Sequence, residues 1–431
     1  MKLFRDLVDG LNKINPLLTA NIKKESNFSV HKMQVGIVGK PNVGKSTFFK
    51  AATLAEVEIA NYPFATIKAN VGIAYLKQKD IARFFNKISN PRDGFVLEKY
   101  RFIPVQMIDV AGLVPGAHEG KGLGNQFLDD LRQADVLIHV IDASGGTNEK
   151  GESVKAGSYD PVEDVKFLET ELDMWYLGIL TKGWEKFARQ VVQEKAKITV
   201  ALAKQLSGLK VTEEIVEAAI KKLDFDIEKP ADWTNDQLKD LTVELRKVTK
   251  PMLIACNKAD VPSAEDNLKK LKQQFPDLLM IPVSSESELA LREASKVSLI
   301  DYIPGEKTFN IKDDNQLNDK QLNALNFIKD SVLKKFEFGT GVQEAINAAV
   351  FRLLKYIAIY PGGSDLCDQD GNVIPDCFLM PPGSTVIDFA YKIHTDLGKK
   401  FIRGIDIKKK LTVGKDHLLQ DQDVIEIVSG R

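Results

Sequence analysis

The nine-residue segment 39–47 (GKPNVGKST) constrains the fold of this chain more than any other feature. It follows an apolar run rich in β-branched residues, 35–38, and precedes a helical pattern at 47–53. The segment matches G-x-x-x-x-G-K-[S/T], in which glycines let successive backbone N–H groups point at one centre and the helix start adds its positive end. Strand, loop and helix together therefore predict a phosphate-binding loop.

Single residues of this loop have separate expected roles. Lys45 is expected to reach the β- and γ-phosphates of a nucleotide, and the Ser46 hydroxyl to ligate Mg²⁺. The nucleotide contacts predicted for the loop are Asn42, Val43, Gly44, Lys45, Ser46 and Thr47.

Four further apolar runs have the character of buried parallel strands, and helical patterns separate them. They are 102–108, 136–141, 252–256 and 278–283. This alternation predicts an α/β fold, with the doubly wound and mostly parallel sheet of a P-loop NTPase. In such sheets the functional loops are expected at the carboxyl ends of the strands.

Two short patterns are predicted to complete the phosphate site. Asp109 and Gly112 form a D-x-x-G pattern directly after the run 102–108, where the carboxylate is expected to hold Mg²⁺ through water and the Gly112 amide to meet the γ-phosphate. Thr66, in the segment 61–67 (NYPFATI), is expected to give its hydroxyl to Mg²⁺ and its amide to the γ-phosphate. Such a segment is ordered only around the triphosphate, which predicts a switch.

Asn257, Lys258 and Asp260 form an N-K-x-D pattern after the run 252–256, which predicts a guanine reader. The Asp260 carboxylate is expected to accept two hydrogen bonds from guanine. Adenine lacks this donor pair, and an unsatisfied buried carboxylate costs about 1–3 kcal/mol or more. Asn257 is expected to tie this loop to the phosphate loop, and the Lys258 stem to cover the base face.

Ser284 and Ser285 follow the run 278–283 and are expected to complete the base pocket with backbone amides. The predicted ligands are thus GTP or GDP with Mg²⁺. The residues assigned to hydrolysis are Lys45, Thr66 and Gly112.

The apolar patterns divide the chain into segments with different expected structures. Residues 33–160 and 249–356 are predicted to form the nucleotide domain, with an excursion at 290–338. Residues 161–248 are helical in pattern and predict an inserted hairpin or small bundle, which serves either as a spacer or as a partner-docking arm. Residues 1–32 lack the compact apolar core and the cleavage signature of a secretory signal. Because Met33 directly precedes the first predicted strand, residues 1–32 are interpreted as an extension upstream of the natural start or as a mobile arm.

The C-terminal segment 357–431 reads as a small β-rich domain with the pattern of a ubiquitin-like β-grasp. One short amphipathic helix is expected at 385–394, and a strand at 423–428. The lysines 408–410, with Arg403 and Lys415, suggest either a basic face for RNA phosphate or a solvated loop.

The motifs together resemble those of the Obg-like GTPases, within them the YchF subfamily in its archaeal form. The resemblance covers about 33–431 and rests on 39–47, 61–67, 109–112 with the glycine-rich run 113–124 (LVPGAHEGKGLG), 257–260, and 388–398 (DFAYKIHTDLG), which is similar to a TGS domain. Many bacterial and eukaryotic members alter the acid of N-K-x-D and prefer ATP. This chain keeps Asn257, Lys258 and Asp260, which favours GTP.

The resemblance also shapes the expected mechanism. Leu113 stands where many GTPases have a Gln that orients the attacking water. The chain thus resembles hydrophobic-substituted GTPases, which hydrolyse slowly alone. Asn42 occupies the position at which related GTPases coordinate K⁺, so K⁺ or a group from a partner protein is expected to replace the Gln. His118 in the glycine-rich run has two interpretations, a solvated residue or an aid to catalysis.

Two classes of function follow from the resemblance. The first is a nucleotide-gated switch that binds the ribosome or RNA through the TGS domain and the helical insertion. The second is a binding module in which nucleotide is a structural ligand and hydrolysis is incidental. An ATP-preferring hydrolase is a further alternative.

Composition sets the surroundings in which these functions are expected. The net charge is −1, so no DNA binding is expected and any RNA contact must come from a local patch. Three cysteines without metal-binding spacing, and no apolar run of about 18 residues, predict a cytoplasmic protein with no membrane span. Cys256 and His139 are predicted to be core residues, the histidine with its hydrogen bonds satisfied.

Overall fold

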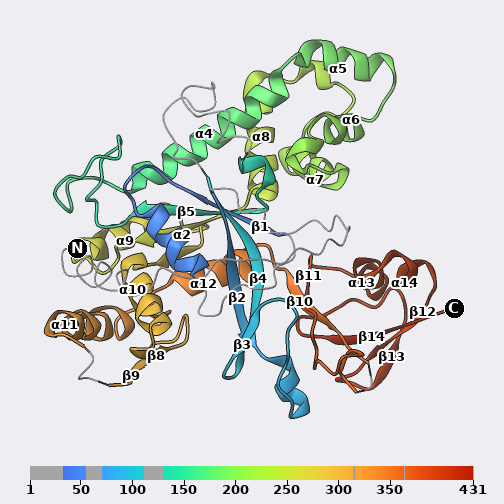
Figure 1. The fold of residues 1–431 in the computed structure, drawn as a ribbon. Coiled ribbons are helices and arrows are strands. Elements are labelled where there is room, and N and C mark those ends of the chain that lie inside the picture. The colour runs from blue at the N-terminus through green and yellow to red at the C-terminus, as the bar shows by residue number, and fades with distance from the viewer. Residues whose placement is uncertain (1–32, 55–69, 111–129, 314–316, 364, 431) are drawn as a thin grey trace. The chain divides into compact units, whose positions relative to one another are not determined.

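The structure is a computed structural model that describes residues 33–54, 70–110, 130–313, 317–363 and 365–430 (Figure 1). The predicted extension 1–32, Thr66, Gly112, Leu113 and His118 lie outside the described residues. The chain divides into two compact units. We call residues 34–45 with 108–281 the first unit, and residues 46–107 with 282–430 the second unit.

Parallel strands form the centre of the first unit. β1 (Gln34–Val38) pairs with β5 (Val136–Asp142), and β5 pairs with β6 (Met252–Asn257). Every residue of β5 and β6 is buried. Burial on both faces explains why these strands read as continuous apolar runs rather than as alternating patterns.

The helical insertion also belongs to the first unit and is drawn in green in Figure 1. In the fully described stretch 161–248 its α-helices are α4 (Val162–Thr181), α5 (Trp184–Gln193), α6 (Ile198–Gln205), α7 (Glu213–Leu223) and α8 (Asn235–Thr249). α4 and α8 pack together, and the Arg246 side chain of α8 donates to Asp173 of α4 at 2.8 Å. α9 (Ala264–Gln274) and β7 (Met280–Pro282) follow.

The second unit contains the helix that follows the phosphate loop, and it has a hydrophobic core of its own. Its elements before the C-terminal domain are α2 (Lys45–Thr53), β2 (Val71–Lys79), β3 (Phe95–Leu97), β4 (Tyr100–Asp109), α10 (Ser285–Lys296), β8 (Ile300–Tyr302), β9 (Phe309–Ile311), α11 (Asp319–Ile328) and α12 (Val342–Asn347). The predicted excursion 290–338 contains the β8–β9 hairpin, α11 and a short π-helix at Lys329–Leu333. Ile300, Leu325 and Leu333 of these elements are buried in one cluster.

The C-terminal part of the second unit is a β-grasp domain. A five-stranded sheet has the order β11-β10-β14-β12-β13. Its elements are β10 (Ile357–Pro361), β11 (Phe378–Met380), α13 (Val386–Ile393), α14 (Thr395–Lys399), β12 (Phe401–Asp406), β13 (Leu411–Val413) and β14 (Val424–Ser429). Phe389 of α13 packs with Ile359 and Ile425 of the sheet, so the amphipathic helix covers one sheet face.

The short amphipathic helix predicted at 385–394 is confirmed as α13, and a second short helix, α14, follows it without having been predicted. His394 has extended backbone, with φ −161°, and this ends α13. Its Nδ1 then accepts a hydrogen bond from the Asp396 amide at 3.1 Å and caps α14.

The lysines 408–410 lie in the turn between β12 and β13. Lys409 pairs with Asp406 at 2.9 Å, and Lys408 donates to the Gln422 carbonyl at 2.9 Å. These local contacts favour the loop interpretation over a basic face.

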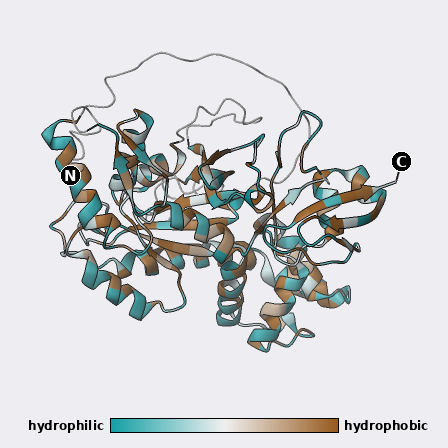
Figure 2. Cartoon of the chain, turned by 90° about the horizontal axis from the view of Figure 1, so that it is seen from below, coloured by the Kyte–Doolittle hydropathy of each residue, from teal (hydrophilic) through white to brown (hydrophobic). Residues whose placement is uncertain are grey.

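Hydropathy follows the layers of each unit. Figure 2 shows apolar residues along the strands and alternating polar and apolar residues around the helices. Cys256 and His139 are buried, as expected of core residues. None of the helices in the described ranges is long and apolar enough to cross a membrane.

Candidate nucleotide site

The loop after β1 is shaped by two glycines that no other residue can replace without a shift. Gly39 and Gly44 have φ of +149° and +98°, in the region that favours glycine. A Cβ at Gly44 would lie 2.2 Å from Nδ2 of Asn257, and one at Gly39 would lie 2.4 Å from the Val140 carbonyl oxygen. The two glycines therefore allow the loop to turn and also let its backbone lie close to β5 and β6.

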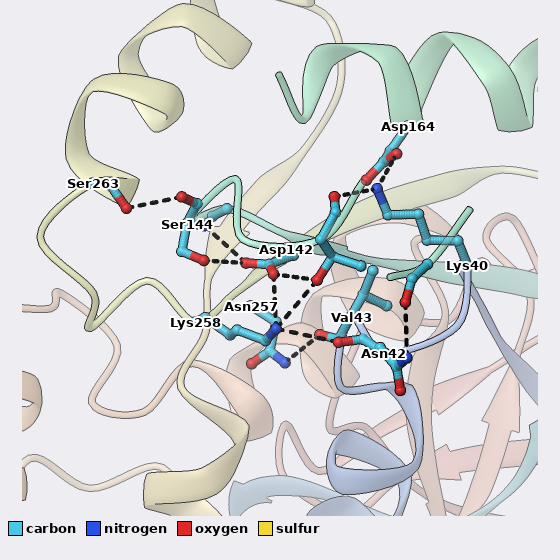
Figure 3. A network of polar contacts seen from close by, with 12 residues as sticks. Lys40, Asn42, Val43, Asp142, Ser144, Asp164, Asn257, Lys258 and Ser263 are labelled. Carbon is cyan, nitrogen blue, oxygen red and sulfur yellow. Dashed lines mark hydrogen bonds and ion pairs between the residues drawn. The ribbon is translucent and has the colours of Figure 1, made fainter. Parts of the chain in front are cut away.

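The structure brings the phosphate loop and the N-K-x-D loop together (Figure 3). Asn257, the last residue of β6, donates from Nδ2 to the Val43 carbonyl at 2.8 Å. Lys258 donates from Nζ to the Asn42 carbonyl at 3.2 Å. Two residues predicted to contact the base are thus bonded to two predicted to surround the phosphates.

Sequence reasoning missed a third component of this cluster, Asp142. It ends β5 and lies opposite Asn257 in the register of the β5–β6 pair. Its carboxylate accepts from Lys258 Nζ at 2.7 Å and from the hydroxyls of Ser144 and Thr147 at 2.5 and 2.6 Å. The available signal was its place, because it is a charged residue at the carboxyl end of an apolar strand.

Lys40 was missed as well, and it joins the phosphate loop to the helical insertion. Its side chain is buried, and its Nζ bonds the Asp164 carboxylate and the Thr147 carbonyl, each at 2.8 Å. The same ammonium lies 3.8 Å from the centre of the Tyr159 ring. Because Asp164 is in the first turn of α4, the loop and the insertion share a buried ion pair.

Asp109 and Lys45 are both partly buried, and each affects the pKa of the other through its charge. Burial raises the pKa of the Asp109 carboxyl, and Lys45 opposes this rise. Burial also lowers the pKa of the Lys45 ammonium, against the effect of Asp109. Within the part of the chain that the structure describes, Asp109 Oδ1 is buried and has no hydrogen-bond partner. An orphaned carboxylate oxygen is the donor that Mg²⁺ prefers, so the residue fits the ion.

The other predicted site residues have varied surroundings. The Asn42 amide nitrogen donates to the Gly151 carbonyl at 2.8 Å, and Asn42 adopts a left-handed φ of 63°. Ser46 and Thr47 open α2, and Asp260 is half-buried after β6. Ser284 and Ser285 are buried at the start of α10. The Ser284 amide donates to the Thr340 carbonyl at 2.9 Å, which leaves this amide engaged within the second unit.

His139, in the middle of β5, differs from its predicted state. It is a core residue, but in the described part of the chain its Nδ1 has no hydrogen-bond partner. Burial, with Lys40 nearby, lowers its pKa to about 3. The imidazole is therefore neutral at pH 7 and plays no part in the site's charge.

Comparisons with known proteins decide the family. Three family models match: "50S ribosome-binding GTPase" at residues 34–168, "Obg-like GTPase YGR210-like, G4 motif-containing domain" at 255–363, and "TGS domain" at 367–429. A GTP-binding protein of Methanocaldococcus jannaschii is 51% identical over 397 residues, which cover 92% of this chain and 98% of the relative. The chain belongs to the YchF-type Obg-like GTPases.

Other relatives agree with this assignment. The ribosome-binding ATPase YchF of Bacillus subtilis is 33% identical over 278 residues, 61% of this YchF-type chain and 69% of the relative. A crystal structure of a GTP-binding protein from Pyrococcus horikoshii covers 92% of this chain and 100% of its own, at 42% identity and a TM-score of 0.75. The Schizosaccharomyces pombe YchF GTPase shares the fold, with 22% identity, a TM-score of 0.56, and coverage of 95% and 100%.

Proposed function

We propose that this YchF-type protein binds GTP, hydrolyses it slowly to GDP and phosphate, and acts as a nucleotide-gated switch associated with the ribosome. The observation that carries the proposal is the hydrogen bond from Asn257 to the Val43 carbonyl, with that from Lys258 to the Asn42 carbonyl beside it. These contacts join a loop suited to a base with a loop suited to phosphates, so one nucleotide spans both.

Preference for GTP is the part of the proposal that depends on Asp260. The carboxylate matches the two donors of guanine, and a site built on hydrogen bonds rejects an analogue that lacks them. Because some relatives are named as ATPases, the preference of this protein for GTP over ATP has to be measured.

The test is competition between GTP and ATP for the wild-type protein and for Asp260→Asn. The substitution is expected to lower the preference for GTP at least roughly tenfold, because the amide cannot accept both hydrogen bonds. Asp266→Asn, on the exposed start of α9, is the matched control and is expected to keep the wild-type preference. A wild-type protein that binds ATP more tightly would overturn the guanine assignment.

Hydrolysis is proposed to use residues around the γ-phosphate. Ser46, Thr66 and Asp109 would hold Mg²⁺, which when bound neutralises phosphate charge. Lys45 would bind the β- and γ-phosphates and the Gly112 amide the γ-phosphate. Since Leu113 cannot orient water, K⁺ held by the Asn42 side-chain oxygen, or a group from a partner, would supply the missing stabilisation. Rates in KCl that equal those in NaCl would exclude K⁺ from this role.

Ribosome association is proposed from the names of the relatives and from the TGS domain. We also propose a cytoplasmic location, since that is where ribosomes are. The test is co-sedimentation with ribosomes in a non-hydrolysable GTP analogue, in GDP and without nucleotide. Binding only with the analogue supports the switch, whereas equal binding in all three states favours a binding module. In the second case Asp109→Asn would leave ribosome binding intact.

A further inference from the structure

We propose that Asp142 is a positioning residue for the nucleotide base, which acts by holding the Lys258 side chain across the base site. The inference rests on the proposed nucleotide binding and adds a residue that none of the sequence motifs contains. It starts from the bond between Asp142 Oδ2 and Lys258 Nζ, at 2.7 Å.

Asp142 is a fixed group. Its side chain is fully buried, while the Lys258 side chain is 30% exposed. Oδ1 accepts from the amide and hydroxyl of Ser144 at 3.0 and 2.5 Å, and Oδ2 accepts from the Thr147 hydroxyl at 2.6 Å. These three donors orient the carboxylate before Lys258 reaches it, as the outer partners of a ligating residue do.

The carboxylate is ionised in this setting. Burial alone would raise the pKa of Asp142, but hydrogen bonds from Lys258, Ser144 and Thr147 outweigh burial and hold it below its ordinary value. The bond to Lys258 is therefore a charge-assisted one, which is stronger than a bond between neutral groups.

Lys258 is held at both ends. Its backbone has a left-handed φ of 58°, which is uncommon for a residue with a side chain. Its Nζ is bound by Asp142 and by the Asn42 carbonyl, with the Thr147 hydroxyl at 3.5 Å. Because the ammonium is occupied by protein groups, the methylene stem is the part left to cover a base face.

Thr147 connects Asp142 to the phosphate loop. Its hydroxyl donates to Asp142, and its carbonyl accepts from Lys40 of the loop. Thr147 therefore links Asp142 to Lys40 of the phosphate loop, in addition to the direct bond from Lys258 to Asn42. Figure 3 shows these contacts as one network.

The test is a double-mutant cycle read as affinity for GTP and GDP. Asp142→Asn removes the charge that holds Lys258, and Lys258→Met keeps the apolar stem without the ammonium. Asp142→Asn is expected to weaken nucleotide binding about 10- to 100-fold, by analogy with the loss of the outer partner of a metal ligand. In the Lys258→Met background the same change is expected to weaken binding less than about threefold, because its effect passes through Lys258.

Two results would overturn the inference. One is Asp142→Asn weakening binding by the same factor in both backgrounds, which is the additivity expected of a merely structural residue. The other is wild-type affinity in a folded Asp142→Asn protein. If that variant does not fold, Ser144→Ala replaces it in the cycle, since it removes one donor to Asp142 and is expected to weaken binding roughly two- to fivefold.

The cycle also separates this inference from the choice of nucleotide. The Lys258 stem covers either purine, so the cycle is repeated with ATP. Tighter binding of ATP by the wild-type protein would overturn the guanine preference alone. Additive effects with both nucleotides would overturn the role of Asp142 alone.

Discussion

Two ion pairs, one in each unit, each join a buried carboxylate to a basic side chain, but their basic side chains differ in solvent exposure. In the first unit Asp142 pairs with Lys258, whose side chain is 30% exposed. In the second unit Glu288 pairs with Arg292 at 2.6 Å, and their side chains are 0% and 4% exposed. We call the pair in the second unit the closed pair, because both side chains are buried, and the pair in the first unit the open pair, because the lysine is partly exposed.

Both members of the closed pair make further hydrogen bonds to other protein groups. Glu288 also accepts from the hydroxyls of Tyr302 and Thr340 at 2.7 and 2.5 Å. Arg292 donates to the Leu54 carbonyl at 3.1 Å and to Gln343 at 3.2 Å. Such a network joins four segments of the second unit. An ion pair in which both side chains are buried therefore stabilises the fold, whereas a pair with one partly exposed side chain is a candidate part of a binding site.

Removal of Arg292 gives the largest expected effect on stability. Arg292→Met leaves the Glu288 carboxylate buried without its cation, which typically costs about 3–5 kcal/mol. Denaturant unfolding without nucleotide is the measurement, with Arg352→Met on the exposed face of the same unit as the control. A loss below about 1 kcal/mol would contradict the distinction between the closed and the open pair.

His139 is expected to give an intermediate effect that depends on pH. Its folded pKa of about 3 lies below its ordinary value of 6.5, so the unfolded chain binds the proton first as pH falls. Stability from the neutral imidazole is complete above about pH 6.5 and is lost toward pH 3, at about 1.4 kcal/mol per pH unit. His139→Leu should flatten this dependence between pH 7 and 5 in denaturant unfolding. An unchanged slope would assign the acid sensitivity to other groups.

Arg92 is expected to give the smallest effect, because its side chain is 58% exposed. It pairs with Asp376 at 2.9 Å and Asp368 at 3.3 Å, close to where buried Arg101 donates to the Ile374 and Pro375 carbonyls. Exposed pairs contribute about 0–1 kcal/mol, so Arg92→Gln should lower the unfolding free energy by less than about 1 kcal/mol. A larger loss would show that exposure alone does not rank these ion pairs.

The motifs carried most of the fold and family assignment. The P-loop, N-K-x-D and TGS patterns predicted a P-loop GTPase with a C-terminal β-grasp domain, and the family models confirm this. Local chemistry explains the success, since Gly44 has the φ that favours glycine and the Asn257 amide donates to the Val43 carbonyl. The short helix α14 was not predicted, because the capping role of His394 is not visible in a hydrophobic pattern.

The residues around the motifs followed only from the tertiary structure. Asp142 and Lys258 are 116 positions apart, and Lys40 and Asp164 are 124 apart. No periodicity links residues at such distances, because parallel strands and the helix after them bring them together. The chemistry of the nucleotide loops can therefore be read from the chain itself, while the partners of Lys40 and Lys258 depend on packing, which alone sets which charges are buried together.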